Sequence, residues 1–79
     1  MWKFNPEQDS FTKLLPTGDY LTLLLEGEGY GLYAGRGDRR VGVGCFLDLG
    51  AAKAAADDLA RGLSLVHHLV DCFGEEVAP

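Results

Sequence analysis

The side chains best suited to chemistry lie near the C-terminal end, where His67 and His68 are adjacent and Cys72 follows one helical turn after His68. Two of these side chains could ligate one metal ion from a helix face, with Asp71 or Cys45 completing the set. Adjacent residues, however, point about 100° apart around a helix, and no recognised ligand spacing occurs. The apolar patterns around both cysteines indicate burial, where thiols behave as small hydrophobic groups. We therefore expect no metal, no cofactor and no catalytic residue, and hence no enzyme.

A glycine-rich stretch from Glu26 to Arg40 offers two further motifs. Gly29, Gly31 and Ala34 match the G-x-G-x-x-A pattern of phosphate-binding loops, and residues 36–38 spell Arg-Gly-Asp. A phosphate loop needs a strand before it and a helix after it, whereas another strand pattern follows here. Gly-Asp is also the composition that a tight hairpin turn favours. We interpret both motifs as hairpin chemistry.

Length and charge limit the function further. The chain has 79 residues, which indicates a single domain over 1–79. Twelve acidic against seven basic residues give a net charge of -5, which disfavours direct nucleic-acid binding and favours a basic protein partner. The low cysteine content and the lack of a secretory leader or membrane-spanning run indicate a cytoplasmic protein with reduced thiols.

The N-terminal segment carries signals that are typical of a helix start. Asn5 is a good N-cap and Pro6 suits the first helical position, so we expect a short helix over Pro6–Leu15. Trp2 and Phe4 would then pin this helix to the core. Pro16 ends the pattern.

From Tyr20 the apolar period changes to two, which predicts three antiparallel strands joined by tight turns at Gly27-Glu28 and Gly37-Asp38. In this register Glu26 faces Gly29, and Arg36 faces Arg39. One apolar face then contains Leu21, Leu23, Leu25, Tyr30, Leu32, Ala34, Val41, Val43 and Cys45. The other face is rich in glycine and carries Tyr20, Leu24, Tyr33 and Phe46; unless the N-terminal helix, Trp2 or Phe4 covers this patch, it is a docking surface.

The C-terminal half predicts helix. Asp48 caps a helix that begins near Leu49, and an apolar stripe continues to Phe73. The stripe fits one long or two consecutive helices packed on one sheet face, and we favour a bend at Gly62. Residues 75–79 are expected to form a frayed acidic tail. The predicted fold class is thus α+β, with an N-terminal helix, a three-stranded sheet and C-terminal helices.

The residues that we expect to bind a partner fall into three groups. Carboxylates on the surface could enter a basic groove that normally holds nucleic acid, although such residues also serve simply as a solvated face. Arginines at one hairpin tip could contact an acidic partner or could keep the strand edge soluble. The candidates are the acids Glu26, Glu28, Asp57, Asp58, Glu75 and Glu76, the arginines Arg36, Arg39 and Arg40, and the aromatic residues Tyr20, Tyr33 and Phe46.

A very short, acidic, cysteine-poor chain with a hairpin sheet followed by Ala-rich helices resembles the phage-encoded anti-CRISPR proteins that inhibit type I surveillance complexes. The resemblance covers the plan of the whole chain. It implies a non-enzymatic inhibitor in the bacterial cytoplasm that binds a Cas subunit and blocks target-DNA binding through acidic residues that mimic DNA. The strands followed by "LDLGAAKAAADDLARG" are also similar to antitoxin-like modules that neutralise small RNases. Both resemblances imply a protein partner.

Overall fold

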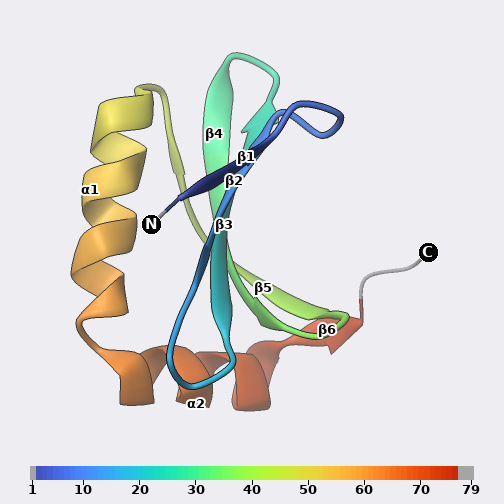
Figure 1. The fold of residues 1–79 in the computed structure, drawn as a ribbon, viewed down its shortest axis with the longest axis vertical. Coiled ribbons are helices and arrows are strands. Elements are labelled where there is room, and N and C mark those ends of the chain that lie inside the picture. The colour runs from blue at the N-terminus through green and yellow to red at the C-terminus, as the bar shows by residue number, and fades with distance from the viewer. Residues whose placement is uncertain (1, 77–79) are drawn as a thin grey trace.

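The computed structural model describes residues 2–76 and contains one antiparallel sheet followed by two helices. The six strands lie in chain order, β1-β2-β3-β4-β5-β6, so every strand pairs with its neighbour in the sequence. In Figure 1, α1 runs beside the sheet and α2 crosses below it. The elements are β1 Lys3–Asn5, β2 Ser10–Leu14, β3 Tyr20–Glu26, β4 Gly29–Arg36, β5 Arg39–Phe46, α1 Leu49–Ala60, α2 Leu63–Phe73 and β6 Glu75–Glu76.

The prediction of an N-terminal helix over Pro6–Leu15 is wrong, because this segment contains the turn after β1 and the strand β2, which pair as a hairpin. The Asn5 side chain accepts a hydrogen bond from the Glu7 N–H at 3.1 Å, and Asp9 adopts a positive φ of 47°. Asn, Pro and Asp therefore build a turn here, using the same side-chain-to-backbone bonds that would cap a helix. The edge of β3 favours the strand over the helix. All five residues of β2 pair with β3, which satisfies the backbone hydrogen-bonding groups along that edge.

The β3–β4 hairpin has the predicted register, with Glu26 opposite Gly29. The β4–β5 hairpin also begins as predicted, with Arg36 opposite Arg39 and Tyr33 opposite Gly42. An irregularity between Leu32 and Tyr33 then shifts the pairing, so that Leu32 faces Gly44 instead of the predicted Val43. A bulge of this kind exchanges the two faces of the strand beyond it.

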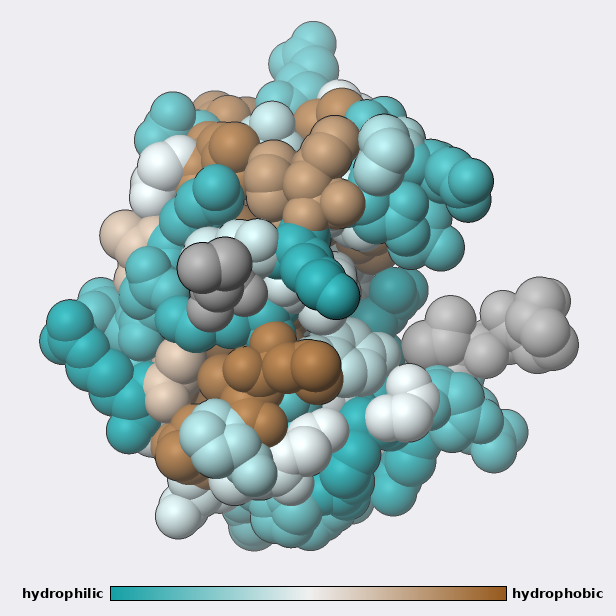
Figure 2. Space-filling model, viewed as in Figure 1, coloured by the Kyte–Doolittle hydropathy of each residue, from teal (hydrophilic) through white to brown (hydrophobic). Residues whose placement is uncertain are grey.

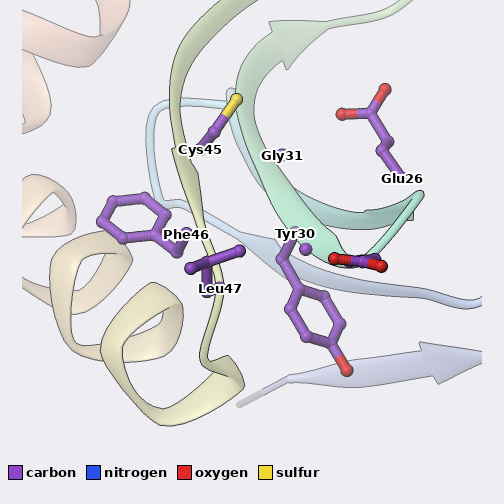
Figure 3. Close-up of a pocket in the computed structure, with 8 residues that line it drawn as sticks. Glu26, Tyr30, Gly31, Cys45, Phe46 and Leu47 are labelled. Carbon is purple, nitrogen blue, oxygen red and sulfur yellow. The ribbon is translucent and has the colours of Figure 1, made fainter.

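The shift changes the environment of three predicted residues in β5. Phe46 turns to the helix side and packs against the core, while Val43 is 39% exposed. Cys45 is exposed, contrary to the expected burial. Figure 3 shows Cys45 and Phe46 pointing to opposite sides of the strand. Phe46 is therefore not part of the aromatic patch that the sequence predicted.

The two C-terminal helices pack on one face of the sheet, and α1 contacts β3, β4 and β5 while α2 contacts β4 and β5. The Asp48 side chain accepts a hydrogen bond from the Ala51 N–H at 2.9 Å, which makes Asp48 the predicted N-cap. The helical stripe breaks at Gly62, which lies between the two helices as expected. The buried core is Leu15, Leu21, Leu23, Leu32, Ala34, Ala52, Ala56, Val66 and Val70.

The sheet extends beyond the three strands that the sequence predicted, at both of its edges. β1 and β2 add to one edge, and the two residues of β6 pair with Arg39 and Arg40 at the other. Glu75 and Glu76, which we expected in a frayed tail, thus form this short strand, and residues 77–79 lie outside the described part of the chain. The α+β class stands, but the expected three-stranded sheet is replaced by a six-stranded one.

Candidate protein-binding face

The helices cover one face of the sheet, and within residues 2–76 no helix or strand covers the opposite face. Cross-strand partners share a face of a sheet, so the pairing of Leu14 with Tyr20 and of Thr12 with Thr22 puts these residues together. Trp2 and Phe4 do not cover them, because Phe4 pairs with Phe11, which packs on the core side. We call this surface the open face; its members are Thr12, Leu14, Tyr20, Thr22, Leu24, Glu26, Tyr33 and Arg40.

Glycines give the two tyrosines of the open face their positions. A methyl group at Gly35 would lie 2.5 Å from the Tyr20 Cζ and 2.6 Å from the Arg39 carbonyl oxygen. Gly42 lies beneath the Tyr33 ring, where a methyl group would meet its edge at an ordinary 3.6 Å. The rings therefore lie flat across glycine backbone, as the sequence predicted for Tyr33 over Gly42.

Tyr33 is also held by two charged side chains, one at its hydroxyl group and one over the face of its ring. Its hydroxyl donates to the Glu26 carboxylate, with distances of 2.7 and 2.8 Å to the two oxygens. The Arg40 guanidinium lies 4.4 Å from the ring centroid. The hydrogen bond to Glu26 raises the pKa of Tyr33 above its usual 10.0, and partial burial adds to this effect. The phenol is thus oriented on the open face in its neutral form.

A groove of about 370 Å³ lies on the open face. The Thr12 and Thr22 hydroxyls are 3.1 Å apart in it, and Thr22 is nearly buried, with 5% exposure. Leu14 borders the groove with 75% of its surface exposed. The lining residues are Gln8, Thr12, Leu14, Tyr20, Thr22, Leu24, Gly37 and Arg40. Because Gln8 and Gly37 belong to turns at the two ends of the sheet, the groove spans the open face between these turns.

A second hollow of about 330 Å³ lies at the other end of β4. Its lining includes Glu26, Tyr30, Cys45 and Leu47, which Figure 3 shows around the strand ends. Leu47 is 85% exposed and does not border the open-face groove. On the side seen in Figure 2, apolar side chains form separate areas divided by hydrophilic ones. Leu47 and Leu14 are thus two exposed leucines in different surroundings.

The structure does not gather the predicted carboxylates into one strip. Glu26 and Glu28 lie at the β3–β4 turn, Asp57 and Asp58 on α1, and Glu75 and Glu76 on β6. Lys13 Nζ lies 3.0 Å from the Asp57 carboxylate, and Arg61 lies 3.5 Å from Asp58. The first pair is partly exposed and the second largely exposed, and both neutralise part of the helix charge.

The three predicted arginines also have partners within the chain. Arg36 forms ion pairs with Asp19 and Asp71. Arg39 donates to the Gly74 carbonyl at 3.0 Å, and Arg40 stacks on Tyr33. The hairpin tip is therefore tied to the end of α2 through Arg36 and Arg39, while Arg40 contacts the sheet.

A charge cluster forms around the buried Asp19 below the sheet. Asp19 is fully buried; its carboxylate accepts from the Thr17 hydroxyl at 2.6 Å and lies 3.0 Å from His67 Nδ1 and 3.3 Å from Arg36. Asp71 completes the cluster, and its hydrogen bond from Arg36 lowers the pKa of the carboxyl below 3.8. Asp71 in turn raises the pKa of the Arg36 guanidinium above its usual value. The sequence predicts that Asp19 or Asp38 neutralises part of the arginine cluster, and the structure places Asp19 in this role. The participation of His67 and Asp71 was not predicted.

Within residues 2–76 no three His, Cys, Asp or Glu side chains are grouped as a metal site, and no helix is long and apolar enough to cross a membrane. The fold defines an α+β domain with a six-stranded antiparallel meander and one uncovered sheet face. The chain matches no family model, no curated protein and no solved structure.

Proposed function

We propose that this chain is a non-enzymatic protein-binding module that docks on its partner through the open face. The observation that carries the proposal is the groove between Leu14, Tyr20 and Leu24 on a sheet face that no described element covers. Half-buried aromatic and apolar side chains in a depression, with hydroxyl groups beside them, are typical of the anchor regions of protein interfaces.

The rigidity of the face supports this proposal. Tyr33 is fixed between Glu26 and Arg40, and Tyr20 lies on Gly35. Side chains that are already ordered lose little conformational entropy when a partner binds, so more of the contact energy remains as affinity. The face is therefore suited to accept an apolar side chain of the partner beside Leu14.

The charge of the chain suggests the nature of the partner surface around that contact. A net charge of -5 attracts a basic protein at long range and speeds the encounter. In this proposal the dispersed carboxylates steer association, while the groove supplies the short-range contact. Affinity should thus fall with added salt, but less steeply than for an inhibitor that binds only through a carboxylate strip.

The resemblance to anti-CRISPR proteins names a particular partner, a Cas subunit of a type I surveillance complex. The six-stranded meander departs from the three-stranded plan on which the resemblance rested. The short length and acidic charge of the chain agree with the resemblance. In this narrower form of the proposal, the bound module blocks target-DNA binding by occupying a basic surface of the complex.

The test measures target-DNA binding by a purified type I surveillance complex with increasing amounts of this chain. The wild type should inhibit. Leu14→Glu should weaken inhibition at least about tenfold, because it places a carboxylate at the groove wall. Leu47→Glu is the matched control, since Leu47 is also a highly exposed leucine but lies outside the groove, and this variant should inhibit as the wild type does.

Each outcome bears on a different part of the proposal. A wild-type chain that neither binds the complex nor inhibits it rejects the Cas partner. Inhibition that survives Leu14→Glu, or that both variants lose equally, rejects the open face as the contact. Circular dichroism of both variants establishes that they are folded.

A further inference from the structure

His68 and Cys72 form an exposed pair on the outer side of α2. Both ring nitrogens of His68 lie 3.6 Å from the Cys72 Sγ. Val66 and Val70, which are fully buried, lie on the opposite side of the same helix. The imidazole and the thiol therefore point together into solvent, away from the core.

The separation of these two donor atoms fits a metal site. Tetrahedral zinc holds a thiolate sulfur at about 2.3 Å and an imidazole nitrogen at about 2.0–2.1 Å, which places the two donors about 3.5–3.6 Å apart. The helix holds residues four apart on one side. Because the sulfur lies equally far from both ring nitrogens, the His68 ring must turn to direct one nitrogen at a shared ion. His68 and Cys72 thus have the spacing of two zinc ligands.

Residues 2–76 do not supply the remaining ligands. Asp71 is engaged by Arg36, and His67 Nδ1 lies against the buried Asp19. No group of three possible ligands occurs within residues 2–76. A structural zinc site requires four protein ligands, so two must come from elsewhere.

We propose that His68 and Cys72 are half of a zinc site that a second copy of this chain completes. A two-fold axis through the ion brings the same pair from both copies and gives a Cys₂His₂ set, one of the common structural zinc sites. Each thiol loses its proton to solvent when zinc binds, so two protons are released for each ion. The two α2 helices then lie against each other across the metal.

Exposed apolar residues on α2 support a second copy as the occupant. Leu65, one turn before His68, is 53% exposed, and Phe73, next to Cys72, is 61% exposed. Both flank the His68–Cys72 pair and would be partly covered when two α2 helices meet. The metal supplies the geometry of the contact, and the apolar residues add buried area.

The experiment adds ZnCl₂ to the reduced full-length chain, with a chromophoric chelator as competitor and light scattering after size exclusion for the mass. We expect one zinc ion for two chains and a doubling of the 8.5 kDa mass. His68→Ala and Cys72→Ser should each lower the zinc affinity by more than about tenfold, because loss of a mere supporting residue already costs 10–100-fold. Cys45→Ser removes the other exposed thiol and is the matched control, which should bind and dimerise as the wild type does.

Cobalt(II) gives an independent readout, since thiolate-to-cobalt charge transfer reports sulfur ligation. This absorption should be lost in Cys72→Ser and kept in Cys45→Ser. Zinc uptake that survives both His68→Ala and Cys72→Ser overturns the assignment, as does absence of uptake by the wild type. One zinc per monomer without dimerisation overturns the shared site.

Discussion

Replacement of Gly35 by alanine tests how the open face is built. The added methyl group would lie 2.5 Å from the Tyr20 Cζ and 2.6 Å from the Arg39 carbonyl oxygen. Both distances are shorter than the contacts that Cβ atoms make with non-bonded atoms in proteins. The ring can turn away from the methyl group, but the carbonyl belongs to the backbone of the adjacent strand. Gly35→Ala must therefore both displace Tyr20 and move β5.

The expected cost follows from the size of this conflict. Overpacking by one methyl group in a close-packed site costs about 1–3 kcal/mol. For a domain of this length each kcal/mol lowers Tm by about 4–8 °C, so the expected fall is about 4–24 °C. Gly42→Ala is the matched control, because its methyl group would meet the Tyr33 ring at 3.6 Å, an ordinary contact. That variant should change stability by less than about 0.5 kcal/mol.

Urea unfolding measures both variants, with the fluorescence of the single tryptophan, Trp2, as the probe and far-ultraviolet circular dichroism as a second one. Trp2 packs against the core, so its emission reports global unfolding. If Gly35→Ala unfolds at the wild-type urea concentration, or if Gly42→Ala costs as much, then Tyr20 does not lie on Gly35 as described.

Three further predictions concern charged groups. Asp19→Ala should cost about 1.5–3 kcal/mol in urea unfolding, because it removes the buried carboxylate that accepts hydrogen bonds from Thr17 and Arg36. Asp58→Ala, at an exposed ion pair, should cost less than about 1 kcal/mol, and equal costs would contradict the role of the buried Asp19. The pKa of Asp71 is lower in the folded chain than in the unfolded chain, so ionised Asp71 stabilises the fold above the unfolded pKa, and this stabilisation is lost as pH falls through the folded pKa. Asp71→Asn should therefore lose less stability than the wild type as pH falls below about 4. An unchanged dependence of the unfolding free energy on pH in this range would refute the prediction. In an ultraviolet titration Tyr33 should ionise above pH 10.0, and Glu26→Gln should lower its pKa by removing the negative acceptor; no change on substitution would show that Glu26 does not hold the phenol.

The hairpin registers were predictable because tight turns and alternating apolar residues fix them locally. Glu26 opposite Gly29 and Arg36 opposite Arg39 follow from two-residue turns at glycine, and both pairings are confirmed. The bulge beyond Tyr33 was not predictable, since β5 carries glycine at 42 and 44 and either register is sterically permitted there. Packing of Phe46 against the helices favours the shifted pairing.

The N-terminal hairpin shows where local signals fail. Asn5 and Pro6 favour a turn as well as a helix start, and only the unpaired edge of β3 decides between them. The same holds for the cluster around Asp19, whose partners Arg36 and His67 lie 17 and 48 residues away in the chain. The open face was predicted in part: Tyr20, Leu24 and Tyr33 share it, and Phe46 does not.

The most direct test of the open face as a docking surface is methyl NMR of the labelled chain as a type I surveillance complex is added. If the open face is the docking surface, the methyl signals of Leu14, Leu24 and Thr22 shift or broaden, while those of Leu47 and Leu65, outside the groove, keep their positions. Changes confined to Leu47, Leu65 or the helices, with the groove methyl groups unaffected, would contradict it.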